Sequence, residues 1–374
     1  MPGISMIMIK PASSLCNMRC RYCFYADETA NRQTPSYGVM TEETLEAVLD
    51  KVLSSAAPRC TIAFQGGEPT MAGLPFFRKV VELEKKLNRR HVTVENAIQT
   101  NGYAMTEEWA AFFAENHFLV GISLDGDKAL HDENRLDAQG KGTYRPVMHA
   151  IQLLQNHKVD FNILTVVTAS TARNIRRIYG FYGRNGFTWQ QYIPCLDPLG
   201  EERGSRPWSL TPERFGQYLK DLFDCWYQDA QRGQRKYNRY FDNLLLLLQG
   251  RWPEACGMSG VCGRQLVVEA DGGVYPCDFY ALDRWKLGNL VTDSLADIEA
   301  KRDQLGFVEM SQPIHEDCRK CRWLSLCRGG CRRDRSNTID GPLGKNYYCS
   351  AYQEFFEYAY PRLRQMVLWE RGGF

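Results

Sequence analysis

Three cysteines near the start of the chain constrain its fold and chemistry more than any other feature. Cys16, Cys20 and Cys23 follow a CxxxCxxC spacing, shortly after the apolar run Ile4 to Ile9. Three thiolates would leave one iron of a four-iron cluster without a protein ligand. A catalytic metal site keeps such a position free for a substrate or cofactor, whereas a structural site closes its coordination shell. The spacing alone also allows a three-thiolate zinc site or three unconnected thiols.

The first two thirds of the chain alternate short apolar runs with amphipathic stretches, which is the pattern of strand–helix units around a parallel sheet. Strands are predicted over residues 4–9, 60–64, 92–98, 118–124, 159–168 and 188–194. Helices are predicted over residues 41–54, 74–87, 147–156 and 172–185, with a further one from 106. Six units fall short of the eight of a closed barrel, so we expect an α/β fold with an open, partial (β/α)6 barrel.

Polar residues follow the predicted strands where the loops begin. The second strand leads into Gln65-Gly66-Gly67-Glu68, the fourth carries Ser123 next to its last residue, and the cysteine triplet follows the first. Functional residues of parallel barrels collect at these carboxyl ends. The sequence therefore predicts one common site for them.

A second group of cysteines fills the last third of the chain: Cys256, Cys262, Cys277, Cys318, Cys321, Cys327, Cys331 and Cys349. In the cytoplasm such clusters usually bind metal or do redox work, and zinc ribbons are the structural alternative. Cys60, Cys195 and Cys225 stand apart and are interpreted as buried or incidental thiols. We expect a barrel over 1–235, a cysteine-rich domain over 236–350 and a C-terminal helix over 351–374, kinked or interrupted at Pro361.

The composition excludes some partners. The 374 residues include 46 Lys and Arg against 44 Asp and Glu, a balance that argues against nucleic acid or a membrane surface as a partner. The N-terminal segment lacks the features of a signal peptide, and no apolar run is long enough to cross a membrane. We therefore expect a soluble cytoplasmic protein.

The two cysteine patterns and the Gly-Gly-Glu turn together resemble the radical S-adenosylmethionine (SAM) enzymes that carry a SPASM domain. The resemblance implies three [4Fe-4S] clusters, held by Cys16, Cys20 and Cys23, by Cys256, Cys262, Cys277 and Cys331, and by Cys318, Cys321, Cys327 and Cys349. It also implies SAM contacts from Tyr22, Gly66, Gly67, Glu68, Ser123, Arg135 and Leu196. For Arg135 a solvated surface charge is the alternative.

Over nearly its whole length the chain is most similar to the anaerobic sulfatase-maturating enzymes, through stretches such as 10–14, 64–70, 275–280 and 346–349. These enzymes oxidise cysteine or serine in a Cys/Ser-x-Pro-x-Arg segment to Cα-formylglycine, after a 5′-deoxyadenosyl radical removes a Cβ hydrogen. The resemblance implies Asp278 as general base and Tyr25 and Gln65 as substrate contacts. A carboxylate of ordinary pKa is a weak base for a thiol, so burial or a substrate contact has to raise its proton affinity.

The resemblance implies an unfolded or nascent sulfatase as substrate and a low-potential electron donor such as ferredoxin or flavodoxin. Two other classes stay open. A SPASM enzyme can instead modify a ribosomally synthesised peptide, by thioether, epimer or crosslink formation. A non-enzymatic iron–sulfur electron carrier would neither bind nor cleave SAM.

Overall fold

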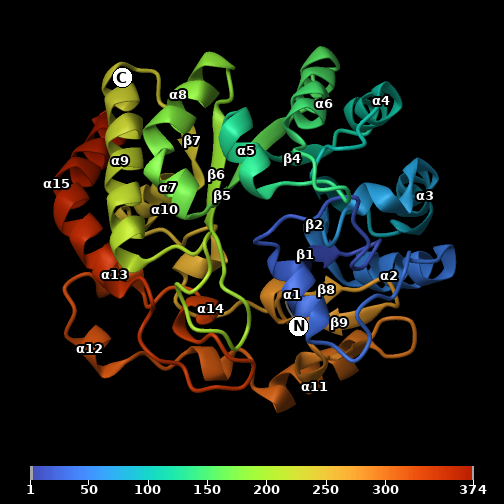
Figure 1. Ribbon diagram of the computed structural model, residues 1–374. Helices are drawn as coiled ribbons and strands as arrows, with labels where there is room; N and C mark the ends of the chain where they lie inside the picture. Colours follow the sequence, from blue (N-terminus) through green and yellow to red (C-terminus); the bar gives the residue numbers. More distant parts are fainter. Residues whose placement is uncertain (1–2, 373–374) are drawn as a thin grey trace. The chain divides into compact units, whose positions relative to one another are not determined.

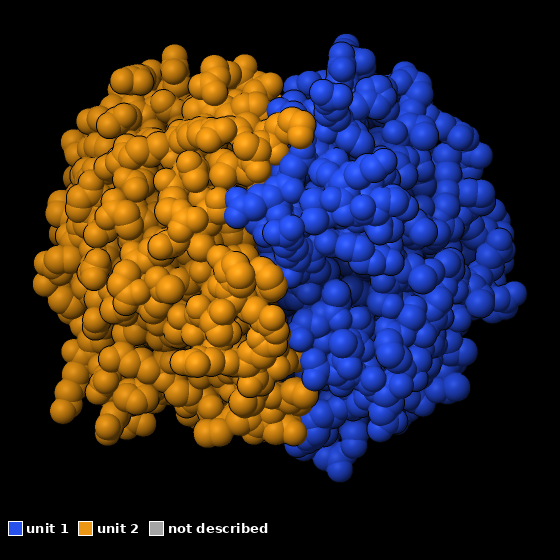
Figure 2. All heavy atoms as spheres, in the orientation of Figure 1, with its two compact units in different colours: residues 1–124, 131–162, 264–307 blue, residues 125–130, 163–263, 308–374 orange. Residues whose placement is uncertain are grey.

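The computed structural model describes residues 3–372, which fold into two compact units (Figures 1 and 2). Unit 1 is built from the described residues up to 124, from 131–162 and from 264–307. Unit 2 is built from 125–130, 163–263 and the described residues after 307. The domain boundaries drawn above from the sequence stay a prediction.

Unit 1 is centred on a run of parallel strands. They pair in the order β1 (Ile4–Ile9), β2 (Ala56–Phe64), β3 (Thr93–Thr100) and β4 (Leu119–Ser123). On the other side of β1 lie β8 (Val267–Val268), β9 (Gly273–Tyr275) and β10 (Gly288–Asn289). β8 runs parallel to β1, and β8 and β9 form an antiparallel hairpin that turns at Gly272.

The helices of unit 1 are α1 (Phe24–Ala30), α2 (Glu42–Ser55), α3 (Leu74–Leu87), α4 (Glu107–Glu115), α6 (Tyr144–Asn156) and α11 (Leu295–Leu305). The sequence predicts α2, α3, α4 and α6 to within three residues at each predicted end, and it does not predict α1 and α11. α5 (Lys128–Asn134) spans a boundary between the units. Thr41 and Thr106 cap α2 and α4 by accepting the amide hydrogens of Thr44 and Trp109. The acidic residues in the first turn of each then face the positive end of the helix dipole.

Unit 2 continues the parallel pattern with most of β5 (Phe161–Val167), followed by β6 (Trp189–Pro194) and β7 (Tyr237–Asn238). Its longer helices are α8 (Ile175–Arg184), α9 (Pro212–Gln231), α10 (Arg239–Leu248) and α15 (Cys349–Gly372). The aromatic side chains of α9 belong to the core, because Phe223 and Trp226 are fully buried against Phe241 of α10.

The α/β fold class is confirmed, since helices separate parallel strands in both units and neither run of strands closes into a barrel among the described residues. One helix prediction is wrong in detail. The predicted helix over 172–185 is α7 (Ala169–Arg173) followed by α8, because Thr168 and Thr171 form a capping box that starts α7 earlier and Asn174 separates the two helices. Of the predicted kink or interruption at Pro361, the interruption does not occur: α15 runs through Pro361, and ring contacts such as the edge-to-face contact of Phe355 with Phe223 pack it against α9.

No helix within residues 3–372 has the length and hydropathy needed to cross a lipid bilayer.

Candidate active site and cluster sites

The glycine turn after β2 is held directly against the loop that carries the first cysteines. The amide of Gly67 donates to the carbonyl oxygen of Ser13, and that of Glu68 donates to the carbonyl oxygen of Leu15, both at 2.8 Å. A Cβ atom on Gly67 would lie 2.2 Å from the Leu15 oxygen, where no side chain fits. Glycine at this position therefore allows the turn to fix the residues that precede Cys16.

Glu68 ties the turn to the next strand. Its buried carboxylate accepts hydrogen bonds from the Thr70 and Thr100 hydroxyls and the Asn101 amide, each at 2.7 Å. Burial raises the pKa of this carboxyl. Because Oε2 accepts only the Asn101 bond, Glu68 has room for one further donor, such as an ammonium group.

The three loop cysteines are half-buried thiols. Burial raises the pKa of the Cys16 thiol to about 11, and the nearby Glu68 and Cys23 add to this effect. The side-chain amide of Asn101 lies 3.7 Å from Cys16 Sγ, within reach of an N–H···S hydrogen bond. A thiolate is the form that binds a metal, so bound iron would compensate the charge that burial disfavours here.

Six of the seven predicted SAM contacts lie in unit 1, and Leu196 does not. The guanidinium of Arg135 is buried and sits 5.5 Å from the ring centroid of Tyr22, so the interpretation of Arg135 as a solvated surface charge is wrong. Ser123 is buried at the end of β4. Leu196 belongs to unit 2, and its part in a SAM site stays a prediction.

Asp278 binds Gln65, which is one of the two predicted substrate contacts, and Lys10, for which no role was predicted. Its Oδ1 pairs with the Lys10 ammonium at 2.5 Å, and its Oδ2 accepts from the Gln65 side chain at 3.0 Å. Lys10 follows β1, Gln65 follows β2, and Asp278 begins the 3-10 helix η3 (Asp278–Tyr280). The Lys10 side chain is fully buried and Asp278 is 9% exposed.

Tyr25 contacts a second buried ion pair, which Glu269 and Arg32 form. Its hydroxyl donates to Glu269, which also pairs with Arg32 at 2.8 Å, and the Lys10 ammonium lies 3.7 Å from the centre of the Tyr25 ring. The same face of α1 buries Glu28. The sequence analysis assigned no role to Lys10, Glu28, Arg32 or Glu269. The i, i+3 spacing of Tyr25 and Glu28 was the available signal, since it places two polar side chains on one side of a helix.

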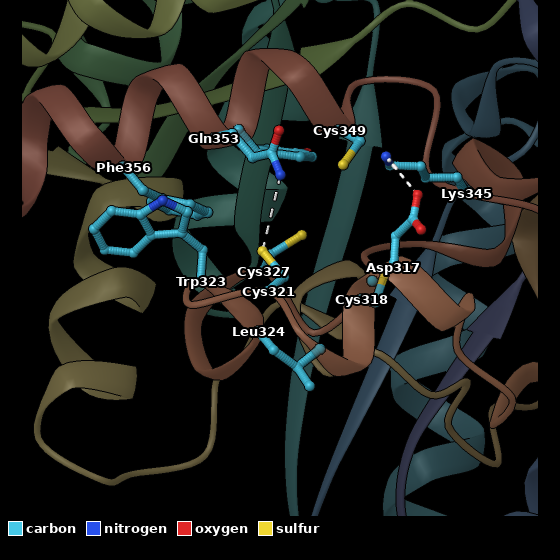
Figure 3. A pocket seen from close by; sticks show the side chains of 12 residues that line it. Asp317, Cys318, Cys321, Trp323, Leu324, Cys327, Lys345, Cys349, Gln353 and Phe356 are labelled. Carbon is cyan, nitrogen blue, oxygen red and sulfur yellow. Dashed lines mark hydrogen bonds and ion pairs between the residues drawn. The ribbon is translucent and has the colours of Figure 1, made fainter.

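The four predicted ligands of the third cluster lie together in unit 2. Cys318, Cys321, Cys327 and Cys349 line one hollow together with the rings of Trp323 and Phe356 (Figure 3). Burial raises the pKa of Cys327 to about 11, and the other three thiols of the set add to the effect. At the rim, Gln353 Nε2 lies 4.0 Å from Cys321 Sγ, and Lys345 pairs with Asp317 at 3.1 Å. Four mutually close thiols with apolar walls fit a fully ligated iron–sulfur cluster.

The four predicted ligands of the second cluster come from both units. Cys256, Cys262 and Cys331 lie in unit 2, where burial and the other two thiols raise the pKa of Cys331. Cys277 lies in unit 1, directly before Asp278. Among the described residues, no three or more His, Cys, Asp or Glu side chains surround the position of a single metal ion.

Comparisons with known proteins agree with both cysteine regions. Residues 11–181 match the model of the radical SAM superfamily, and residues 256–322 match that of an iron–sulfur cluster-binding domain, SPASM. The chain is 48% identical to the cysteine-type anaerobic sulfatase-maturating enzyme of Clostridium perfringens, over 97% of this chain and 98% of the relative. It is 34% identical to the serine-type anaerobic sulfatase-maturating enzyme of Bacteroides thetaiotaomicron, over 95% and 89%.

A solved structure shows the same architecture. Native anSMEcpe with bound AdoMet and Cp18Cys peptide superposes with a TM-score of 0.92 at 47% identity. The match covers 97% of this chain and 98% of that one.

Proposed function

The chain belongs to the family of anaerobic sulfatase-maturating enzymes, and from this premise we propose that it oxidises a cysteine side chain of a sulfatase to Cα-formylglycine. The observation that carries the proposal is 48% identity to a cysteine-type enzyme across 97% of the chain. Cysteine is the preferred target, since identity to the serine-type relative is lower, at 34%.

The proposed cofactors are SAM and three [4Fe-4S] clusters, with the ligand sets given above. The four thiols around the hollow of Figure 3 support the cluster that is farther along the chain. The half-buried thiols of Cys16 and Cys23, near the free acceptor of Glu68, support a SAM-binding cluster at the first loop. When bound, these groups supply the radical that removes one Cβ hydrogen and the route by which one further electron leaves.

Side chains of the protein accept the proton that the substrate loses. In the proposed reaction Asp278 accepts the thiol proton of the target cysteine, which together with loss of the Cβ hydrogen and one electron gives a thioaldehyde. Water then hydrolyses the thioaldehyde to the aldehyde and releases sulfide. Lys10 and Gln65 each bind one carboxylate oxygen of Asp278, so its orientation is set before the substrate arrives. Such fixed geometry is what a general base needs.

Tyr25 is proposed to receive the target side chain. Its hydroxyl hydrogen is donated to Glu269, so the phenolic oxygen keeps a lone pair that can accept a hydrogen bond from the substrate. The substrate partner is an unfolded or nascent sulfatase, because the target side chain must reach buried residues. We infer a ferredoxin- or flavodoxin-type donor, and the cytoplasm as location because cysteines proposed as iron ligands need a compartment in which thiols stay reduced.

The test is anaerobic incubation of the reconstituted protein with SAM, a strong reductant and a peptide containing Cys-x-Pro-x-Arg. We expect 5′-deoxyadenosine in step with loss of about 18 mass units from the peptide, as thiol and hydrogen are replaced by a carbonyl oxygen. A peptide with serine in place of cysteine is the matched control and should react more slowly. Formation of 5′-deoxyadenosine with an unchanged peptide would redirect the substrate search to ribosomally synthesised peptides. Absence of both from fully loaded protein would contradict the enzymatic function.

A further inference from the structure

The buried residues around Asp278 carry more acidic than basic groups. Two cations, Lys10 and Arg32, are buried with three carboxyls, those of Glu28, Glu269 and Asp278. Glu269 is paired with Arg32 and Asp278 is paired with Lys10. Glu28 is therefore the carboxyl for which no cation is left.

Glu28 also lacks the hydrogen bonds that a buried carboxylate requires. One oxygen, Oε1, accepts the amide hydrogen of Ala281 at 2.5 Å, while Oε2 is buried without a partner. The residue is 2% exposed, so solvent does not supply the missing donors. An ionised carboxylate in such surroundings is strongly disfavoured, whereas a protonated one is tolerated.

The charged groups that face Glu28 come from three elements. They are Lys10 at the end of β1, Asp278 at the start of η3 and Arg32 just after α1. Burial is the largest effect on Glu28 and raises its pKa to about 8; Asp278 acts in the same direction, and the two cations oppose it. The raised pKa of Glu28 therefore agrees with the excess of carboxyls over cations among these buried residues.

We propose that Glu28 is held as a neutral carboxylic acid in the working enzyme, so that the Lys10 ammonium pairs with Asp278 alone and holds that carboxylate in place. Glu28 is thus a positioning residue that acts through Lys10. If Glu28 ionises, a second carboxylate competes for the same ammonium, and Asp278 loses the partner that orients it. The functional part of this inference rests on the proposed role of Asp278 as base.

Glu28→Gln is the matched perturbation, because the amide keeps an acceptor for Ala281 and cannot ionise. Glu84→Gln is the control, since burial also raises the pKa of Glu84 to about 7, but its carboxyl binds Asn96 on β3. If only enzyme with a neutral Glu28 turns over, a pKa of about 8 makes wild-type turnover fall about tenfold from pH 7 to pH 9. We expect this ratio to shrink to less than about twofold in Glu28→Gln and to stay about tenfold in Glu84→Gln.

Infrared spectroscopy of the cluster-loaded protein, with isotope-labelled glutamate, supplies a measurement that needs no turnover. The band of neutral carboxylic acid at pH 7 should lose intensity in Glu28→Gln. In Glu84→Gln, the band that remains should weaken between pH 7 and pH 9. The inference is overturned if Glu28→Gln keeps the tenfold ratio or leaves the band unchanged. If Glu28→Gln does not load its clusters, absence of the neutral-acid band from Glu84→Gln at pH 7 overturns it. The infrared result decides the state of Glu28 even if no formylglycine forms.

Discussion

Removing the Lys10 ammonium is the most direct test of the buried pair beside the proposed base. Lys10→Met keeps the unbranched side chain that packs under the glycine turn and deletes only the charge. At 2.5 Å, the pair is worth about 7 kcal/mol of Coulomb energy for an effective dielectric of 20. Desolvation of both groups offsets part of this, and breaking a buried pair typically costs about 3–5 kcal/mol.

Asp278→Asn is expected to cost a similar amount, because it leaves the fully buried Lys10 ammonium without a counter-charge. The double variant leaves no uncompensated charge, so its loss of stability should be less than half the sum of the two single losses. The assay is thermal unfolding of the cluster-loaded protein under anaerobic conditions. Each single variant should melt about 6–10 °C lower, at about 2 °C per kcal/mol.

The exposed pair Arg59–Glu95 provides the control. Its side chains are 72% and 46% exposed, so Arg59→Met should leave the melting temperature unchanged. Additive losses in the Lys10→Met, Asp278→Asn double variant would refute the reasoning, since they would mean that the two charges do not interact.

Three further predictions address other parts of the chain. Gly67→Ala puts a methyl group 2.2 Å from the Leu15 carbonyl oxygen, so the reconstituted protein should lose the iron of about one cluster; Gly183→Ala, whose methyl meets only a lysine side chain at 3.6 Å, should keep it. Cys349→Ala should lower the iron content by about four atoms per chain, and unchanged iron would contradict its assignment as a ligand. Glu84→Gln tests a pH effect on stability: because burial raises the pKa of Glu84 to about 7, the folded chain keeps a proton that the unfolded chain releases near pH 4.5. That stabilisation is present at low pH and lost as the pH rises through about 7, by up to about 3 kcal/mol, and urea unfolding of Glu84→Gln should lack this loss.

The elements that the sequence predicts well are those whose signals are local. β1 follows from one apolar run, and α3 begins and ends at the predicted residues because its apolar positions repeat at helical spacing. The four thiols of the hollow in unit 2 are another case, since three of them lie within the span 318–327. Local patterns suffice where the interacting residues are neighbours in the chain.

The breaks and continuations of helices were harder to predict. Pro361 removes one amide hydrogen and usually ends or bends a helix, yet α15 continues through it to Gly372. The compensation comes from packing, such as the ring contact between Tyr227 of α9 and Trp369 of α15, whose centroids are 5.7 Å apart. Nothing near Pro361 in the sequence carries that information.

The charges around Asp278 could not be predicted either, because the residues that carry them lie far apart in the chain. Lys10 and Asp278 are 268 positions apart, and Tyr25 and Glu269 are 244 apart. The sequence marks Asp278 by its neighbour Cys277, but the count of buried cations and carboxyls depends on three separate segments of unit 1. That count singles out Glu28, which no motif includes.

The glycine turn shows how a local motif and this distant arrangement depend on each other. Gly66 has a φ of +128°, and a Cβ atom there would lie 3.1 Å from the Cβ atom of Lys10, closer than side chains normally approach. Gly67 in turn makes room for the carbonyl oxygen of Leu15. The two glycines thus allow the loop before Cys16 and the stem of Lys10 to pack under the turn that also supplies Gln65 to Asp278. A side chain at position 66 would therefore disturb the ion pair as well as the cysteine loop, so the motif has a structural purpose in addition to any contact with a cofactor.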